Sequence, residues 1–438
     1  MELELIGHAQ VLLRTADARI WTDPWLSGTA FNGSWRLWPE PAFPSERLDE
    51  VDFLWISHEH PDHFHLPTLR ALPAAFRRRV TVLFQDLSSD KVVSALRRLG
   101  FHDIRPLRHR ARTRLRPATE VCLYQVGQMD SALWVSSGGA SVLNLNDCEV
   151  SDHDLSLLRA DLGPVDVLLG QFSMAGYLGH VDRARVLPVR ARQKLDALVR
   201  AHRALGAGLT VPFASLVYFC TTDNRYMNEF ASWPRDVARR FAAEDLGLAV
   251  LYPGDRLQVG AAPPPLEPAL ARYDAARARV PGLPYDDTPP LPLPELERTF
   301  AARAERLRAR YPGVVLRALG SLTVRVPDLA ARVRLSFGRG AFDVLPAAGD
   351  ADLEVRSQPL QDALAHPWGL QTLCVSARLV LLRDSAAWRA HRLLFALDNA
   401  DIALRPGQLF TPRNARHLLR RWRGGVAQVL HRLRIRET

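Results

Sequence analysis

Cysteine is scarce in this sequence of 438 residues. The four cysteines lie far apart and form no C-x-x-C pair, which argues against a disulfide framework and against a zinc site built from cysteine alone. No run of about 18 apolar residues is present, and the first residues lack the basic and apolar regions of a secretory signal. We therefore expect a soluble protein of the reducing cytoplasm, with no membrane span.

Lysine is almost absent. Lys91 and Lys194 are the only two, so nearly all of the 57 basic residues are arginine. With 47 acidic residues the formal net charge is +10, which by itself would suggest a nucleic-acid or membrane partner. Residues 405–438 hold most of the excess, with nine arginines and one acidic residue, Glu437. We therefore expect no nucleic-acid partner. The tail is predicted to be a basic amphipathic helix that docks on the protein, or that contacts an anionic substrate, an acidic partner or a membrane surface.

The pattern of apolar residues indicates two domains. Hydrophobic residues make up 47% of the chain, which is enough for a large core. Up to residue 260, short apolar runs typical of buried strands alternate with amphipathic runs typical of helices. The expected strands are 51–57, 80–84, 142–145, 165–169 and 209–213, and the expected helices are 66–72, 89–99 and 186–205.

The second half of the chain begins with a segment dense in proline. Residues 261–294 are predicted to form an extended connection, because proline removes backbone donors and favours extended conformations. Residues 295–438 follow as a smaller α+β domain, with a helix at 295–310 and strands at 322–326, 332–337 and 352–356. The predicted domains are therefore 1–260 and 295–438.

Three histidines and an aspartate follow the strand 51–57 at H-x-H-x-D-H spacing. They are His58, His60, Asp62 and His63. In an extended segment His58 and His60 project the same way, and Pro61 ends that extension. Imidazole and carboxylate together suit a transition metal or a close pair of metals. The alternative is a polar loop that happens to be rich in histidine. His65 is interpreted as a residue with a local structural role, or as one that supports the ligands through hydrogen bonds without binding the metal itself.

This motif resembles the metallo-β-lactamase fold superfamily. The resemblance implies an α/β fold, a four-layered αβ/βα sandwich with one or two metals at the sheet edges. It implies that Asp23, in Ile20–Gly28, supports the metal loop by hydrogen bonds, although an Asp-Pro turn explains it equally well. It also implies that Asp147, after Asn144, is a bridging carboxylate; the alternative is a turn residue at a strand end. His8 is interpreted as structural.

Further stretches resemble the CMP-N-acetylneuraminate hydroxylase family and its bacterial relatives. They are Asp23–Leu26, Met129–Ala132, Gln171–Ser173, Val211–Ala214 and Asp223–Asn228, with weaker matches around Trp368 and Ser376–Arg378. In that family a Rieske iron–sulfur domain is joined to a metallo-β-lactamase-like part. The activity implied is oxygen-dependent hydroxylation of a sugar nucleotide.

Two departures from this family affect the expected chemistry. No cysteine is followed by a histidine two or three residues on, so the sequence has no Rieske motif. Electrons would then come from a separate electron-transfer protein, a small reductant or the substrate. Two downstream histidines of the family pattern are also missing. Asp130 is the first choice to replace a ligand, although a structural aspartate that caps the next turn explains it at least as well. The other candidates are Gln128, Asp223 and His180.

Two reactions compete if a pair of metals surrounds Asp147. Iron, most simply a di-iron centre, would support oxygenation of a small metabolite. Zinc or manganese would support hydrolysis of a phosphodiester, ester or lactone, and a non-catalytic role is the third alternative. Asp62, His63 and Asp147 are the expected catalytic residues.

The expected substrate contacts are Arg225, Tyr226 and Trp25. The first two suit a phosphate or carboxylate, since guanidinium binds either group through two hydrogen bonds. The alternatives are a structural salt bridge for Arg225 and core positions for Tyr226 and Trp25.

Overall fold

The structure is a computed structural model of the whole chain. It describes residues 1–43, 45–87, 89–127, 129–174, 176, 182–399 and 403–404. The predicted basic helix of the tail and two of the substitute ligands, Gln128 and His180, lie outside these residues. No helix in the described ranges has the length and apolar character needed to cross a bilayer.

The N-terminal part contains two large sheets. The first has seven strands in the order β16-β1-β2-β3-β6-β7-β8. β3, β6, β7 and β8 run parallel, whereas β16, β1 and β2 pair antiparallel. The strands are β1 (Glu2–Gly7), β2 (Gln10–Arg14), β3 (Arg19–Thr22), β6 (Phe53–Trp55), β7 (Thr81–Gln85), β8 (Ile104–Leu107) and β16 (Arg256–Gln258).

The second sheet has six strands in the order β14-β13-β12-β11-β10-β9. They are β9 (Arg112–Arg116), β10 (Thr119–Val126), β11 (Asp130–Ser137), β12 (Ala140–Asn144), β13 (Val167–Gln171) and β14 (Leu209–Phe213). Leu5, Ile20 and Trp55 of the first sheet share one buried core with Leu133 and Leu169 of the second. The two sheets therefore pack face to face.

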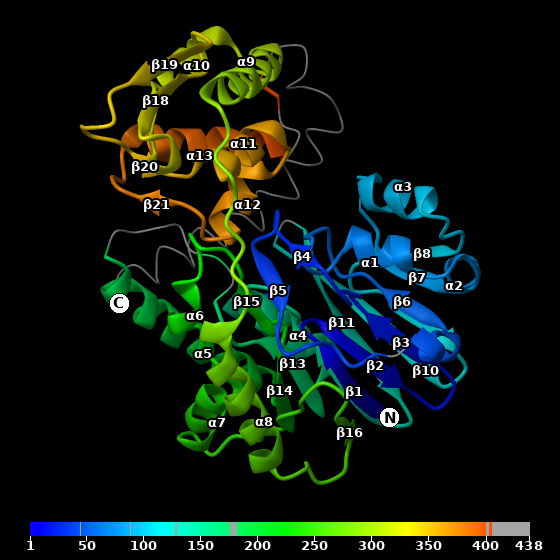
Figure 1. Cartoon of the computed structure of the whole chain (residues 1–438). Coiled ribbons are helices and arrows are strands. Elements are labelled where there is room, and N and C mark those ends of the chain that lie inside the picture. The colour runs from blue at the N-terminus through cyan, green and yellow to red at the C-terminus, as the bar shows by residue number, and fades with distance from the viewer. Residues whose placement is uncertain are drawn as a thin grey trace.

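Helices cover both outer faces of this pair of sheets (Figure 1). On the first sheet they are α1 (Leu66–Ala71), α2 (Ala74–Arg79) and α3 (Lys91–Arg98), and on the second they are α4 (Asp152–Leu162) and α5 (Arg183–Leu205). Leu69 and Leu96 pack in a core with Leu54 of β6, and Leu158 and Leu205 pack in another beneath the second sheet. This four-layered arrangement confirms the predicted α/β sandwich.

The C-terminal part has its own sheet and core. Its five strands are ordered β19-β18-β17-β20-β21, and Figure 1 shows this part above the sandwich, with α12 on the side that faces it. The strands are β17 (Leu322–Val326), β18 (Ala331–Ser336), β19 (Ala341–Leu345), β20 (Leu353–Glu354) and β21 (Val380–Leu381). The helices are α9 (Leu293–Arg310), α10 (Gly313–Ala318), α11 (Ser357–Ala365), α12 (Gly369–Val375) and α13 (Ala386–Asn399).

Smaller elements complete the N-terminal part. A three-stranded sheet contains β4 (Thr29–Ala30), β5 (Trp35–Leu37) and β15 (Val217–Phe219), and two short helices follow it, α6 (Met227–Phe230) and α7 (Pro234–Ala242). The small sheet carries Phe31, in the turn after β4, to the edge of the sandwich where the histidines lie.

The expectation of an extended segment at 261–294 is wrong for its middle. Residues Leu266–Arg279 form helix α8, and Leu270 and Tyr273 are buried in the core of the sandwich. Pro268 lies in the first turn of α8, where an amide has no acceptor within the helix, so it does not break the helix. The domain limits 1–260 and 295–438 stay a prediction.

Candidate metal centre

The loop that carries His58, His60, Asp62 and His63, here called the histidine loop, begins where β6 ends. Hydrogen bonds to Asp23 hold it there. Asp23 follows β3 and adopts a positive φ of 37°. Its carboxylate accepts hydrogen bonds from the amide and the hydroxyl of Ser57, both at 2.7 Å, and from the side chain of Asn146 at 2.9 Å. His63 Nδ1 lies 2.8 Å from the same carboxylate. Because Nδ1 is engaged by Asp23, Nε2 is the nitrogen of His63 that can face a metal ion at the centre of the cluster.

The first donor set consists of His58, His60 and Asp130. His58 Nε2 lies 2.7 Å from His60 Nδ1 and 3.9 Å from Asp130 Oδ1. Asp130 is the first residue of β11, so the second sheet supplies a carboxylate to the loop of the first. The three donor atoms lie within 4.8 Å of one another, which one metal ion can span.

The second donor set consists of His8, Asp62 and His63. Asp62 Oδ2 lies 3.2 Å from His8 Nε2 and 3.4 Å from His63 Nε2. His8 follows β1 directly, and its carbonyl oxygen accepts a hydrogen bond from the amide of Ala214. All three side chains are buried. The structure thus brings together a histidine that the sequence analysis interprets as structural with the predicted ligands.

Asp147 lies between the two donor sets. Its Oδ2 is 3.7 Å from His58 Nε2 and 3.5 Å from His63 Nε2, and His58, His63 and Asp147 form a third group of donor atoms within 4.8 Å. One carboxylate oxygen therefore faces a histidine from each set. This is the placement that a bridging carboxylate needs.

Unpartnered polar atoms show that this cluster fits a cation. Burial of a polar atom without a hydrogen bond costs free energy, so such atoms are rare and require an explanation. Within the described residues, this cluster contains six of them: His8 Nδ1, His60 Nε2, Asp62 Oδ1, His63 Nε2, Asp130 Oδ1 and Asp147 Oδ1. Because imidazole nitrogen and carboxylate oxygen are metal donors, the residues present fit one or two transition-metal ions.

The electrostatics of the cluster differ between its two central histidines. Burial would lower the pKa of His63, but Asp62, Asp147 and Asp23 raise it well above its ordinary value, and a bound cation would replace that proton. Burial lowers the pKa of His58 well below its ordinary value, so its imidazole is neutral, as a metal ligand must be. Burial alone would raise the pKa values of Asp62 and Asp147, but the neighbouring histidines hold both low. Burial and Asp147 raise the pKa of Asp130 well above its ordinary value. A bound cation would stabilise the charged form of all three carboxylates.

Three other predicted residues lie beside the cluster or away from it. His65 caps the N-terminus of α1, since its Nδ1 accepts a hydrogen bond from the Thr68 amide at 3.2 Å. Trp25 is fully buried and packs edge-on against His8 at 5.6 Å, behind the cluster. Asp223 forms an ion pair with Arg378 at 2.9 Å and does not face the donor sets.

Arg225 and Tyr226 lie at the junction of the two parts of the chain. Arg225 is exposed, with its guanidinium 5.9 Å from the ring of Tyr285, and the Tyr226 hydroxyl donates to the carbonyl of Ala377 at 3.1 Å. Neither lines the pocket at the cluster. Their assignment to substrate binding stays a prediction without support from this geometry.

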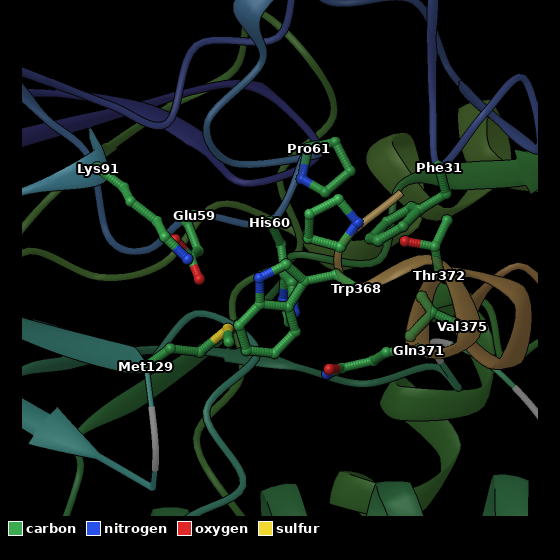
Figure 2. A pocket seen from close by; sticks show the side chains of 11 residues that line it. Phe31, Glu59, His60, Pro61, Lys91, Met129, Trp368, Gln371, Thr372 and Val375 are labelled. Atoms are coloured by element: carbon green, nitrogen blue, oxygen red, sulfur yellow. The ribbon is translucent and has the colours of Figure 1, made fainter. Parts of the chain in front are cut away.

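A pocket of about 290 Å³ opens beside His60. Figure 2 shows its walls: Phe31, Pro61 and Met129 come from the N-terminal part, and Trp368 and Gln371 come from the C-terminal part. The sequence analysis assigns no substrate-binding role to Met129, Trp368 or Gln371. Because these side chains come from two distant parts of the chain, only the tertiary structure shows that they line one pocket.

Comparison with known proteins agrees with the fold and the cluster. Residues 2–170 match the family model of the beta-lactamase superfamily domain. With the four-layered sandwich, this shows that the N-terminal part has the metallo-β-lactamase fold. The match ends inside β13 and includes both donor sets and Asp147.

Two curated relatives are similar to parts of the chain. A Mycobacterium tuberculosis protein named as a Rieske 2Fe-2S iron-sulfur protein is 28% identical over 256 residues, which cover 54% of this chain and 48% of the relative. Cytidine monophosphate-N-acetylneuraminic acid hydroxylase of Danio rerio is 44% identical over 71 residues, which cover 16% of this chain and 12% of the relative. The chain thus matches about half of the first relative's length and a much smaller share of the second.

Two solved structures are similar over somewhat more than half of the chain. CmlA, a diiron beta-hydroxylase from Streptomyces venezuelae, has a TM-score of 0.42 and 19% identity and covers 59% of this chain and 54% of its own. Isothiocyanate hydrolase from Delia radicum gut bacteria has a TM-score of 0.43 and 15% identity and covers 59% and 98% respectively.

Proposed function

We propose that this chain is a non-haem di-iron oxygenase that hydroxylates or otherwise oxidises a small metabolite. The observation that carries the proposal is the composition of the donor sets. His58, His60 and Asp130 make one set of two histidines and one carboxylate, and His8, His63 and Asp62 make another. Two histidines and one carboxylate with open positions are typical of non-haem iron oxygenases. Asp147, between the sets, is the proposed bridge.

The chain's own residues would prepare the site for this chemistry. Bound iron would supply the redox chemistry that moves oxygen from O₂ to a carbon or nitrogen centre. Asp23 and Asn146 orient the histidine loop, and the apolar pocket wall limits water around the substrate. His60 borders both the first donor set and the pocket, so it is where the substrate would meet the metal.

An oxygenase of this kind needs electrons from elsewhere. Hydroxylation by O₂ consumes two electrons in addition to those of the substrate, and no cysteine of this sequence has the histidine spacing of a Rieske site. We propose a separate electron-transfer protein as the source, with a small reductant or the substrate as alternatives. The names of the Rieske and hydroxylase relatives support an oxidative reaction, and the hydroxylase makes a sugar nucleotide one candidate substrate.

A metal-dependent hydrolase is the second candidate. Two histidines and a carboxylate also hold catalytic zinc in hydrolases, and the beta-lactamase superfamily match is compatible with that chemistry. Zinc or manganese at the same donors would then act on a phosphodiester, an ester or a lactone. A chain that binds no metal at these donors would be a non-catalytic member.

Metal identity separates these candidates. The protein is purified without oxygen from cells grown on ⁵⁷Fe, and its metals are counted by mass spectrometry. We expect about two irons per chain, with a Mössbauer spectrum that changes from ferrous to ferric when O₂ is admitted. His60→Ala should lose iron, whereas the exposed His102→Ala should retain it. A protein that holds zinc only and consumes no O₂ contradicts the proposal, and turnover of a lactone or phosphodiester would then support the hydrolase.

A further inference from the structure

The pocket beside the metal centre is completed by the C-terminal part of the chain. Glu59, His60 and Pro61 of the histidine loop form one side. Trp368, directly before α12, and Gln371, on α12, form the opposite side (Figure 2). Because His60 belongs to the first donor set, a molecule in this pocket would lie next to the proposed metals. The N-terminal part thus holds the donor atoms, and the C-terminal part supplies the opposite wall of the pocket.

Trp368 is held in this wall at a conformational cost. It has a positive φ of 64°, a backbone conformation that is strained for a residue other than glycine. Its amide donates to Asn399 Oδ1 at 2.9 Å. The next residue, Gly369, has no room for a Cβ, which would lie 2.5 Å from the carbonyl oxygen of Asp362. Surrounding contacts therefore fix a strained backbone that directs the half-buried indole into the pocket (Figure 2).

The end of α12 is anchored to the N-terminal part. Arg378 pairs with Asp223 at 2.9 Å, with both side chains largely buried. The Asn224 side chain donates to the Ser376 carbonyl at 2.9 Å, and the Tyr226 hydroxyl donates to that of Ala377. We call these three contacts the junction anchor. It keeps α12 as a fixed wall of the pocket.

The side chains of the pocket indicate what it can bind. Phe31, Met129 and Trp368 present apolar and aromatic surfaces, and Gln371 and Thr372 present neutral hydrogen-bonding groups. Although 57 residues of the chain are Lys or Arg, the described residues that line the pocket include one lysine, Lys91, and no arginine. Proteins commonly recognise phosphate groups with arginine. The volume of about 290 Å³ is at the small end for ligand pockets.

We infer that the substrate is a small, flat aromatic molecule without phosphate, which stacks on Trp368 and is hydrogen-bonded by Gln371. This inference rests on the proposed function, because it assigns the substrate class of the same metal site. It makes Trp368 and Gln371 the residues that determine specificity, and it makes a sugar nucleotide a poor substrate.

The test uses the zinc-loaded full chain and ligand-observed NMR with three probes: indole-3-carboxamide, cyclohexanecarboxamide and cytidine monophosphate. We expect the aromatic amide to bind most tightly. Trp368→Ala should weaken its binding about tenfold, since stacking and burial of an aromatic pair are lost, and Trp368→Phe should retain most of it. Val344→Ala, at a position 54% exposed in the C-terminal part, is the matched control and should change nothing.

A second variant serves if Trp368→Ala does not fold. Gln371→Leu should weaken binding of indole-3-carboxamide and leave binding of indole unchanged, because only the amide meets Gln371. Tighter binding of cytidine monophosphate than of the aromatic amide overturns the inference, as does unchanged binding in both variants.

Iron content and O₂ consumption are measured on the same variants purified without oxygen and without added zinc, so that the two proposals fail separately. Bound iron without aromatic binding overturns the substrate class and leaves the proposed function standing. Aromatic binding that depends on Trp368 in a chain that takes up no iron contradicts the proposed function, while the specificity of the pocket stands.

Discussion

At the scale of single residues, Asp23 organises the metal centre without belonging to a donor set. Its positive φ turns the carboxylate toward the loop after β6, where it meets Ser57, His63 and Asn146. These partners come from both sheets. One carboxylate therefore sets the orientation of a histidine donor and also ties the two halves of the sandwich together at the site.

His8 is interpreted as structural from the sequence, and the structure places it in the second donor set. We predict that His8→Ala removes one of the two metals, because His8 Nε2 is a donor of the second set. The affinity loss should exceed the roughly 10- to 100-fold that follows loss of an outer hydrogen-bonding partner. Metal counts by mass spectrometry and titration with Zn²⁺ or Fe²⁺ measure it.

The control for this prediction is His102→Ala, at an exposed position, which should leave both metals in place. Far-UV circular dichroism verifies that His8→Ala is folded, since His8 also packs against Trp25. Two metals with unchanged affinity in a folded His8→Ala protein would show that His8 is structural, as the sequence analysis interprets it.

At the scale of elements, the turn Asp223–Tyr226 acts as a connection between the two parts of the chain. This turn and Ser376–Arg378 are both among the stretches that resemble hydroxylases, and the two stretches contact each other. Together they form the junction anchor, which positions α12 above the histidine loop.

Breaking the anchor should destabilise the chain more than breaking a surface pair. Asp223→Asn leaves the charge of Arg378 uncompensated, and that side chain is 4% exposed, so we predict a loss of about 3–5 kcal/mol. Asp49→Asn removes the partner of Arg79 at a carboxylate that is 97% exposed, and should change stability by less than about 0.5 kcal/mol. Urea unfolding followed by tryptophan fluorescence measures both. Equal midpoints for the two variants would show that the anchor contributes little.

At the scale of the whole molecule, acid should weaken the ion pairs that join β16, β1 and β2 at one edge of the first sheet. Glu4, on β1, is 3% exposed in its side chain and meets Arg14 of β2 at 2.6 Å, Arg47 at 2.6 Å and Arg256 of β16 at 3.2 Å. Burial would raise its pKa, but hydrogen bonds from Arg47 and Arg14 lower it below its ordinary value of 4.5. A carboxyl group whose pKa is lower in the folded chain than in the unfolded chain stabilises the fold at pH values above its unfolded pKa. That stabilisation is lost as the pH falls through the pKa of the folded chain.

We predict that Glu4→Gln removes part of this acid sensitivity. At neutral pH the variant should be about 1.5–3 kcal/mol less stable, the contribution typical of a hydrogen bond to a charged group. The difference from the parent chain should shrink as the pH falls below about 4.5. Urea midpoints of the metal-free proteins at several pH values measure it, with exposed Glu40→Gln as control. A difference that stays constant with pH would contradict the prediction.

Much of the sandwich follows from local patterns. The apolar runs predicted as strands correspond to β6, β7, β12, β13 and β14, because a strand buried on both faces needs a continuous apolar run. Asp130 is predicted as a substitute ligand because it lies in the stretch where the hydroxylase family pattern offers a histidine, and its Oδ1 lies 3.9 Å from His58 Nε2. The middle of segment 261–294 was missed, because proline at the start of a helix does not prevent the helix.

The sequence by itself determined the α/β layers, the histidine loop at the end of a strand and the donors that are close in the chain. These depend on the spacing of apolar residues and on backbone geometry over a few residues. Only the tertiary structure decided that His8 meets Asp62, that Asp223 pairs with Arg378 and that Trp368 closes the pocket. These contacts join residues 54, 155 and roughly 300 positions apart. Such meetings depend on how sheets and helices pack, which no local pattern encodes.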